Sequence, residues 1–335
     1  MAQFSNELRV DQKPGYGDFQ TWTAAINEAV SVQGASGTNP WTILGNRHPN
    51  PWTENLVVPA GLTLQGRGRA HTVIDGHVDI HGGVLMRDLR VFATTNPSAH
   101  SYGVRFINDT PGRSGFLHNV SVIIANTNAS TTSCIQVEGS RTDALLQIDV
   151  CDFYANLKYT GANPGGSIRN ALYRVMGDYQ GVVQSWNTHH KSSTTATGTA
   201  VSTFILNEAV APSSGFAYVH AEGGGWEDLY GGNGVTPAPV LLQSANTVHP
   251  GAWLDISFMS PYTDSDASFS PALNMAYAGS LYGVFYNRQM RKIRLWGGAR
   301  LKHSPNDLPY YPSIMLDHAP TSADLAPEGT TADFI

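Results

Sequence analysis

Residues 14–30 read PGYGDFQTWTAAINEAV and residues 51–76 read PWTENLVVPAGLTLQGRGRAHTVIDG, and these two stretches decide the fold. In the first stretch, apolar residues recur at helical spacing and fall on one face, which predicts a short amphipathic helix. These residues are Phe19, Trp22, Ile26, Ala29 and Val30. Asp18 lies just ahead of them and is the predicted N-cap.

The second stretch has the pattern of short strands rather than of a helix. Leu56–Val58, Leu62–Leu64 and Thr72–Ile74 are rich in branched residues, and each lies next to turn-forming residues. A short helix followed by many short strands predicts a capped β-solenoid. The helix would close the first turn, which otherwise exposes an unpaired strand edge and an open apolar core.

The same residues resemble the opening of right-handed parallel β-helices of the pectin-esterase type. GYGDFQTWTAAI is similar to the family pattern G-x-G-D-F-x-T-hydrophobic-x-x-A-I, and PWTENLVVP is similar to the strand pair that follows it. LTLQGRGRAHTVIDG is similar to the next turn of that family. The resemblance extends to about Gly76 and implies a parallel β-helix with an N-terminal helical cap.

The family's activity depends on residues further along the helix: a pair of glutamines, two aspartates and an arginine in a Gly-Arg-Pro-Trp motif. The sequence shows none of this set in the family's pattern, and Leu295-Trp296-Gly297 does not match the Gly-Arg-Pro-Trp motif. Asp152-Phe153 is the nearest counterpart of the family's Asp-Phe step, but no Gly follows it. The resemblance therefore implies the scaffold without the esterase activity.

Composition limits the class of protein. The chain has 335 residues, of which 14% are charged, with 34 Gly and 19 Pro, as in an all-β protein of short strands. The net charge is −6, and the basic residues gather only in the short run Arg288–Arg294, so nucleic acid is not an expected partner. Cys134 and Cys151 are expected as buried thiols, with one disulfide as the alternative.

The N-terminal residues MAQFSNELRVDQ lack the apolar core of a secretory signal, and no apolar run is long enough to span a bilayer. We therefore expect a chain made in the cytoplasm that does not insert into a membrane.

The expected organisation has four parts: an N-terminal arm over 1–14, a capped parallel β-helix over 15–235, a small β-domain over 236–302, and an extended Pro-rich acidic tail over 303–335. A loose repeat supports the second part, because Leu89, Val120, Val150 and Val175 follow one another at steps of roughly 25–31 residues. The segments 94–101, 109–114 and 187–198 are predicted as outward-facing loops.

Carboxylates near successive turns are the candidates for glycan cleavage, which needs a pair of acids. They are Asp149, Asp152, Asp178, Glu208, Glu222, Glu227 and Asp228. The alternative is that each is simply solvated, as most surface carboxylates are. No catalytic motif joins them, so the sequence predicts no catalytic residue.

Three other features have competing interpretations. His77, Asp79 and His81 would share one face of a strand, but the two imidazoles would lie roughly 13 Å apart, so an exposed polar face is expected rather than a metal site. Gly223-Gly-Gly-Trp226 is expected to be a turn rather than a phosphate-binding loop. A set of aromatic residues, expected mainly in the core or at a subunit contact, could instead stack on sugars. This set is Trp186, Tyr218, Trp226 and Tyr230. No cofactor is expected.

A chain with a capped β-helix, no catalytic set, no export signal, a second β-domain and a Pro-rich acidic tail resembles the structural proteins of tailed-bacteriophage virions. In those virions, short β-helices form trimeric spikes, fibres or capsid decorations. The function expected is structural and adhesive, in a homotrimer that contacts other virion proteins and binds, as one option, a host-surface glycan. The alternative is a polysaccharide-active enzyme, either a depolymerase or a carbohydrate esterase, on the same scaffold.

Overall fold

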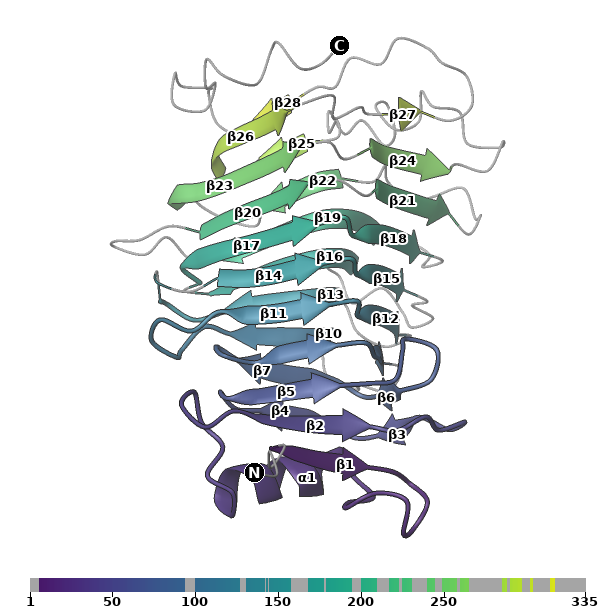
Figure 1. Cartoon of the computed structure of the whole chain (residues 1–335). Helices are drawn as coiled ribbons and strands as arrows, with labels where there is room; N and C mark the ends of the chain where they lie inside the picture. The colour runs from purple at the N-terminus through teal and green to yellow at the C-terminus, as the bar shows by residue number, and fades with distance from the viewer. Residues whose placement is uncertain are drawn as a thin grey trace.

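A computed structural model describes the chain over 6–93, 100–126, 131–141, 143, 145–157, 168–177, 179–194 and 200–209. Beyond residue 209 it describes the backbone of the strands given below. Across these residues the molecule is a parallel β-helix built of three sheets, with one short helix at its N-terminal end (Figure 1). The predicted fold class is therefore confirmed.

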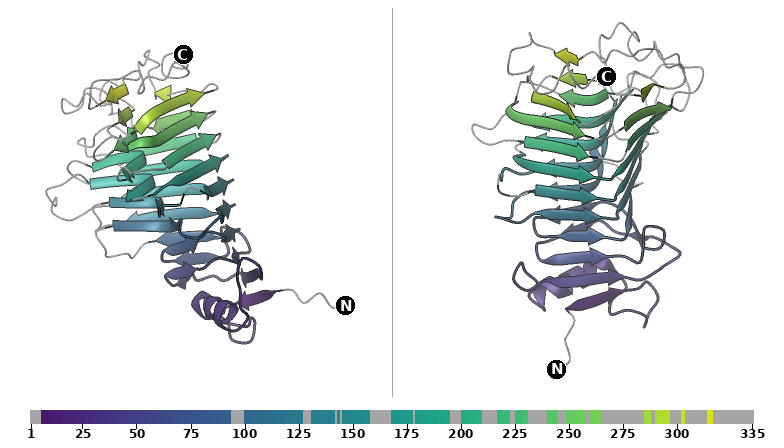
Figure 2. Two further views of the ribbon diagram at one scale, coloured as in Figure 1. Left: turned by 90° about the vertical axis from the view of Figure 1, so that its left-hand side faces the viewer. Right: turned by 45° about the horizontal axis from the view of Figure 1, so that its top comes forward.

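From β2 onward each described turn of the β-helix contributes one strand to each of the three sheets, and the described strands pair in parallel. We call the sheets the long sheet, the β3 sheet and the β4 sheet. The views in Figure 2 show their strands stacked along one axis, from β1 at one end to β26 near the other.

The long sheet has ten described strands. They are β1 (Glu7–Val10), β2 (Trp41–Gly45), β5 (Leu62–Gln65), β8 (Leu85–Arg87), β11 (Gly115–His118), β14 (Leu145–Asp149), β17 (Gly181–Trp186), β20 (Ala217–Glu222), β23 (His249–Ser257) and β26 (Met290–Trp296).

The β3 sheet has nine described strands. They are β3 (Trp52–Thr53), β6 (Val73–Asp75), β9 (Arg90–Ala93), β12 (Ser121–Asn126), β15 (Asp152–Leu157), β18 (His189–Thr194), β21 (Gly225–Tyr230), β24 (Ser260–Asp264) and β27 (Lys302–His303).

The β4 sheet also has nine described strands. They are β4 (Leu56–Val58), β7 (Val78–His81), β10 (His100–Ile107), β13 (Thr131–Glu138), β16 (Ile168–Gly177), β19 (Ala200–Ala209), β22 (Val240–Ser244), β25 (Phe285–Asn287) and β28 (Ile314–Leu316).

The core is a stack of apolar side chains inside the three sheets. Burial alternates along the strands, as on β14 and β17, because successive side chains of a strand point to opposite faces. One interior column of the long sheet is Ile43, Leu64, Met86, Leu117 and Ile148, each buried and in register with the next. Burying one such side chain contributes about 1.5–3 kcal/mol.

The turn lengthens along the chain. The steps from Ile43 to Leu64 and from Leu64 to Met86 are short, and the step from Met86 to Leu117 is clearly longer. The last described step along the long sheet, from Leu254 to Ile293, is nearly twice the step from Ile43 to Leu64. A fixed repeat length therefore fails as a guide to the later turns.

The connection from the long sheet to the β3 sheet keeps a constant, tight form. Its first residue is left-handed at Asp88, Asn119, Val150 and Asn187, with φ of 57°, 53°, 52° and 49°. The residue after each is buried. The true successor of Leu89 and Val120 is therefore Cys151, one residue beyond the predicted Val150, which is 42% exposed. Val175 belongs to another sheet, on β16.

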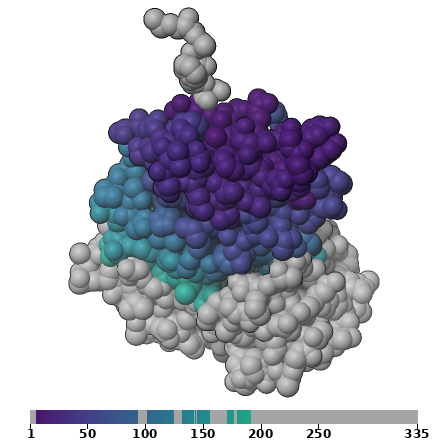
Figure 3. Space-filling model, turned by 90° about the horizontal axis from the view of Figure 1, so that it is seen from below, coloured from purple at the N-terminus to yellow at the C-terminus, as the bar shows by residue number. Residues whose placement is uncertain are grey.

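Helix α1 (Trp22–Ser31) caps the first turn, as predicted. Its buried residues are Trp22, Ala25, Ile26 and Ala29, and the N-terminal segment covers this end of the molecule in Figure 3. The N-cap is Thr21 rather than the predicted Asp18.

The side chains of Asp18 and Glu54 complete the capped end. Asp18 accepts a hydrogen bond from the backbone N–H of Arg9, on the outer edge of β1, at 2.7 Å. The Glu54 carboxylate accepts the N–H groups of Trp22 and Thr23, both at 2.9 Å. An anion at a helix N-terminus satisfies orphan N–H groups and complements the helix dipole.

Both ends differ from the expected organisation. Glu7–Val10, within the predicted arm, forms edge strand β1, and residues 1–5 lie outside the described part. The separate β-domain predicted for 236–302 is not seen: the described strands β22 to β27 pair with the preceding turns. Because the later turns are longer, the spacing of the early strands does not predict this continuation. In the predicted tail, Ile314–Leu316 adds β28 to the β4 sheet, and the rest lies outside the described residues.

The predicted loops agree with the structure in part. Most residues of 109–114 are exposed, whereas 187–198 contains β18, whose His190 is only 1% exposed. Residues 94–99 and 195–198 lie outside the described residues. Both cysteines are buried and free, as expected, and burial raises the pKa of the Cys151 thiol to about 12. None of the described helices has the length and apolar character to cross a membrane.

Candidate functional site

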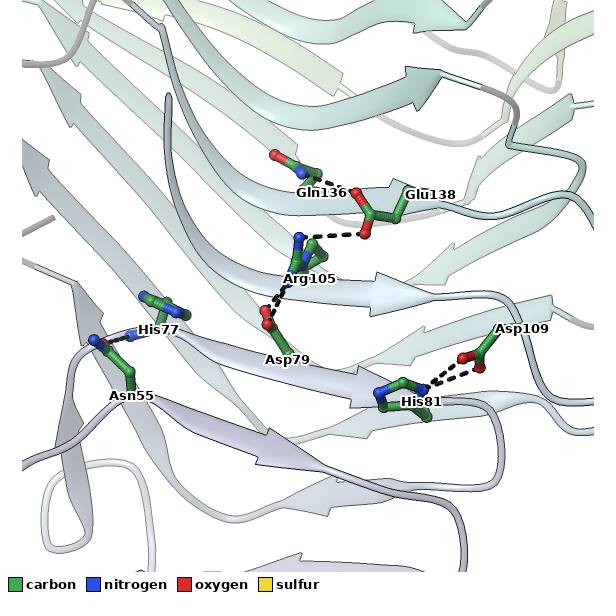
Figure 4. Close-up of polar contacts among 8 residues, drawn as sticks. All are labelled: Asn55, His77, Asp79, His81, Arg105, Asp109, Gln136 and Glu138. Atoms are coloured by element: carbon green, nitrogen blue, oxygen red, sulfur yellow. Dashed lines mark hydrogen bonds and ion pairs between the residues drawn. The ribbon is translucent and has the colours of Figure 1, made fainter. Parts of the chain in front are cut away.

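The most connected group of charged side chains lies on the outer face of the β4 sheet. Asp79 on β7, Arg105 on β10 and Gln136 on β13 are in register on three consecutive strands. Buried Val78 and Ile80 flank Asp79, so its side chain points away from the core, as predicted. We call Asp79, Arg105, Gln136 and Glu138 the Arg105 cluster (Figure 4).

Arg105 holds this cluster together. Its Nε and Nη2 donate to the two carboxylate oxygens of Asp79 at 3.0 and 2.5 Å, and its Nη1 lies 3.2 Å from Glu138. The Gln136 amide donates to the other Glu138 oxygen at 3.4 Å. Asp79 is only 4% exposed, so the predicted exposed polar face is instead a nearly buried ion pair. A two-pronged contact of this kind is the strongest form of Arg–carboxylate pairing.

Two rings border the cluster. The rings of His77 and Tyr102 lie 5.0 Å apart between centroids, and the Arg105 guanidinium lies 5.2 Å from the Tyr102 ring. Burial lowers the pKa of His77, and Arg105 adds to this effect while Asp79 opposes it. Burial and the Asp79 carboxylate raise the pKa of Tyr102. Both rings are therefore uncharged at neutral pH.

This geometry limits the chemistry of the cluster. Glycoside hydrolysis needs two carboxyl groups about 5–10 Å apart with the sugar or a water between them. Asp79 and Glu138 lie on strands two apart, but both contact the same guanidinium. Arg105 thus occupies the place between the acids, and the cluster acts as an ionic link across three strands.

The metal site considered for His77, Asp79 and His81 does not form. His81 contacts Asp109 with Nδ1 at 2.9 Å, whereas Asp79 is bound to Arg105 and His77 lies against Tyr102. In the part of the chain that the structure describes, no three metal-ligating side chains gather at one point.

The predicted carboxylate set is distributed over all three sheets. Asp149 and Glu222 lie on the long sheet, and Glu208 lies on the β4 sheet. The β3 sheet carries Asp152, Glu227 and Asp228. Asp178 is outside the described residues.

Several outward side chains join one turn to the next. His118 lies 3.3 Å from Asp149 on the following strand of the long sheet. His189 lies 3.1 Å from Asp152 on the preceding strand of the β3 sheet. Asn119 donates to Asp88, one turn earlier, at 2.7 Å. Together with the Arg105 cluster and His81–Asp109, these contacts form what we call the inter-turn clasps.

The aromatic residues for which a sugar-stacking platform is the alternative interpretation are divided between two sheets. Trp186 and Tyr218 lie on adjacent strands β17 and β20 of the long sheet, whereas Trp226 and Tyr230 lie on β21 of the β3 sheet. Trp226 is a strand residue rather than part of a turn. Residues 223 and 224 lie outside the described part.

Sequence reasoning singled out Asp79 but missed Arg105, Gln136 and Glu138. A signal was present, because the step from Arg105 to Gln136 equals the step from Leu89 to Val120 in the predicted repeat. The step from Asp79 to Arg105 is shorter, so the repeat could not align all three.

A scan against protein-family models and a search of the curated proteins both found no match. Solved structures with a similar fold include pectin methylesterases. The enzyme from carrot has a TM-score of 0.42 and 14% identity, over 86% of this chain and 88% of its own. A pectin methylesterase in complex with a hexasaccharide has a TM-score of 0.41 and 12% identity, over 82% of this chain and 96% of its own. The pectin methylesterase PemA from Erwinia chrysanthemi has a TM-score of 0.39 and 12% identity, over 82% of this chain and 96% of its own. This likeness concerns the fold alone.

Proposed function

We propose that this protein is a non-enzymatic structural component of a bacteriophage virion surface, either a capsid decoration or part of a tail spike or fibre. The observation that carries the proposal is the set of inter-turn clasps. In the clasps, outward carboxylates are engaged by an Arg, His or Asn of a neighbouring turn. Side chains that could do acid–base chemistry are here used for cohesion.

Cohesion on both faces suits a load-bearing rod. Inside, the apolar columns stack from turn to turn, and outside, the clasps cross the same boundaries. An exposed ion pair contributes only about 0.2–1 kcal/mol. Many such pairs along a solenoid nevertheless add resistance to local opening at each boundary, because each turn contacts only its neighbours.

The proposal includes a homotrimer that contacts other virion proteins, made in the host cytoplasm and carried on the particle. The part of the chain from 303 to 335 is proposed to contribute to contacts between subunits. Its Pro-rich, acidic composition would form little core of its own.

Light scattering on the full-length protein tests the assembly. A trimer gives three times the mass of the single chain, which is 36.0 kDa, and trypsin should leave the β-helix intact. Antibodies raised against the protein should label bacteriophage particles in electron micrographs. A monomer that trypsin degrades, or particles that carry no label, would overturn the proposal.

One observation favours a second candidate, a polysaccharide-active enzyme. Asp79 and Glu138 are two acids in one cluster beside Tyr102 and His77. If Arg105 moved aside on substrate binding, the two acids would be free to act. Release of reducing ends or methanol from a polysaccharide panel, abolished by Asp79→Asn, would establish this candidate in place of the structural one.

A further inference from the structure

Two glutamine amides on the long sheet have unused hydrogen-bonding capacity. Gln147 on β14 and Gln184 on β17 are in register, and both are partly exposed on the outer face. Among the residues that the structure describes, neither side chain has a hydrogen-bond partner. Each amide offers two donors and an acceptor to whatever binds there.

Four apolar side chains lie next to these amides, and Asp149 lies beside Gln147 on β14. Phe116 on β11 is in register with Gln147 and is 39% exposed. Leu145 and Val182 flank the two glutamines on one side, and Trp186 flanks the second of them on the other. All four apolar residues lie at outward positions, because the residues between them are buried. We call Phe116, Leu145, Gln147, Val182, Gln184 and Trp186 the glutamine face.

Two pairs of charged side chains border this face among the described residues. Arg87 lies 2.8 Å from Asp88, and His118 lies 3.3 Å from Asp149. Asp149, the carboxylate next to Gln147 on β14, is thus engaged by His118, and the six residues of the glutamine face are uncharged. The surface therefore offers apolar area and neutral amides, which complements an uncharged ligand rather than a polyanion.

The strand register continues over the next turns. Tyr218 is aligned with Val182, and Trp253 is aligned with Tyr218. His220 occupies the position aligned with Gln184. Apolar and hydrogen-bonding residue types thus recur at neighbouring register positions on successive strands, which are about 4.8 Å apart.

We propose that the glutamine face binds a strand of neutral polysaccharide lying along the axis of the β-helix. The apolar faces of its sugar rings would pack on Phe116, Val182 and Trp186. Its hydroxyl groups would exchange hydrogen bonds with Gln147 and Gln184. The inference rests on the proposed structural function, because it assigns an adhesive surface to the same rod, and it differs in location from the Arg105 cluster.

Affinity electrophoresis tests the proposal. The full-length protein is run in native gels containing hydroxyethylcellulose, dextran or galactomannan, with homogalacturonan as the charged comparison. We expect retardation by at least one neutral polymer, and about tenfold weaker binding for Trp186→Ala and for the double variant Gln147→Ala/Gln184→Ala. Retardation by none of the three neutral polymers, or retardation that both variants retain, would overturn it.

Val57→Ala is the matched control, because Val57 is 57% exposed on β4, in a different sheet. It should leave retardation unchanged. The glutamine variants guard against misfolding of the Trp186 variant, since they remove no apolar side chain, and thermal unfolding of every variant reports its fold.

A subunit contact is the other use of such a face, and light scattering separates the two. If Phe116→Glu converts an oligomer to a monomer and no neutral polymer retards the wild type, the face joins copies of the chain and the polysaccharide proposal fails. The structural function is judged separately by mass, trypsin resistance and particle labelling, so one proposal can fail while the other stands.

Discussion

At the scale of single residues, one backbone conformation recurs at the first residue of successive connections from the long sheet to the β3 sheet. It is left-handed at Asp88, Asn119, Val150 and Asn187. Asn and Asp adopt this conformation at low cost, whereas a β-branched residue is strained in it. Val150 is therefore the exception in an otherwise well-suited series.

Val150→Asn should raise the free energy of unfolding by about 1 kcal/mol, because it relieves this strain at an exposed position. Urea denaturation measures the change. The reverse substitution Asn119→Val is the matched control and should destabilise by at least as much, since it also removes the hydrogen bond to Asp88. Equal stability of wild type and Val150→Asn would show that this turn stores no strain.

His77 should make stability depend on pH. Burial lowers its pKa below the ordinary 6.5, so the unfolded chain binds this proton more readily than the folded one. This contribution is complete above about pH 6.5 and is lost as the pH falls through the lower folded-state pKa. His77→Gln should flatten that part of the profile in urea titrations between pH 7.5 and 4.5. A profile that stays parallel to the wild type would contradict this assignment.

At the scale of elements, polar side chains join strands both outside and inside the solenoid. Outside, Arg105 links β7, β10 and β13. Inside, the Tyr173 hydroxyl donates to Ser185 at 3.0 Å and lies 2.7 Å from His190 Nε2, so one buried contact joins all three sheets. Such networks are costly to break, because a buried polar group that loses a hydrogen bond cannot replace it with one to water.

Arg105→Met should lower the free energy of unfolding by about 3–5 kcal/mol, because it leaves the Asp79 carboxylate nearly buried and unpaired. The double variant Asp79→Leu/Arg105→Met should recover much of the loss, since it removes both charges. Arg141→Ala, which breaks the exposed pair with Asp143, is the control and should have no measurable effect. A double variant no more stable than Arg105→Met would argue against a charge-based cause.

Tyr173→Phe should cost about 1–3 kcal/mol, because the ring is retained while the contacts to Ser185 and His190 are lost. Thermal unfolding measures this. Phe153→Leu, at the ring packed against Tyr173 with centroids 5.8 Å apart, serves as a comparison for loss of packing without loss of a hydrogen bond. An unchanged midpoint for Tyr173→Phe would mean that the hydroxyl network contributes nothing net.

At the scale of the whole molecule, the solenoid is built of turns that contact only their neighbours. The described strands of each sheet pair with the strand one turn before and one turn after. Such a protein tolerates the loss of turns from an end more readily than a globular domain does, provided that the remaining end is closed.

A chain ending at residue 239, before β22, should therefore keep its N-terminal turns folded and protected from trypsin. Deletion of residues 1–33, which include β1 and α1, should instead give insoluble protein, because it uncovers β2 and the apolar core. Circular dichroism and limited proteolysis report both results. Complete unfolding of the chain that ends at residue 239 would contradict the idea that each turn is stabilised only by its neighbouring turns.

The sequence by itself determined the class of fold, the capping helix and the position of most early strands. These features depend on local patterns: helical spacing from Trp22 to Ala29, and branched residues next to turn formers from Leu56 to Ile74. The inward direction of Val78 and Ile80 also follows from alternation alone.

Only the tertiary structure decided the register of the later turns and the partners of the polar residues. The turn nearly doubles in length along the chain, so equal spacing could not align Val150 correctly or show that β22 to β27 continue the helix. Asp79 acquires its role from Arg105, which stacking brings beside it from the next turn. The glutamine face likewise exists because register aligns Phe116, Gln147 and Gln184 across strands.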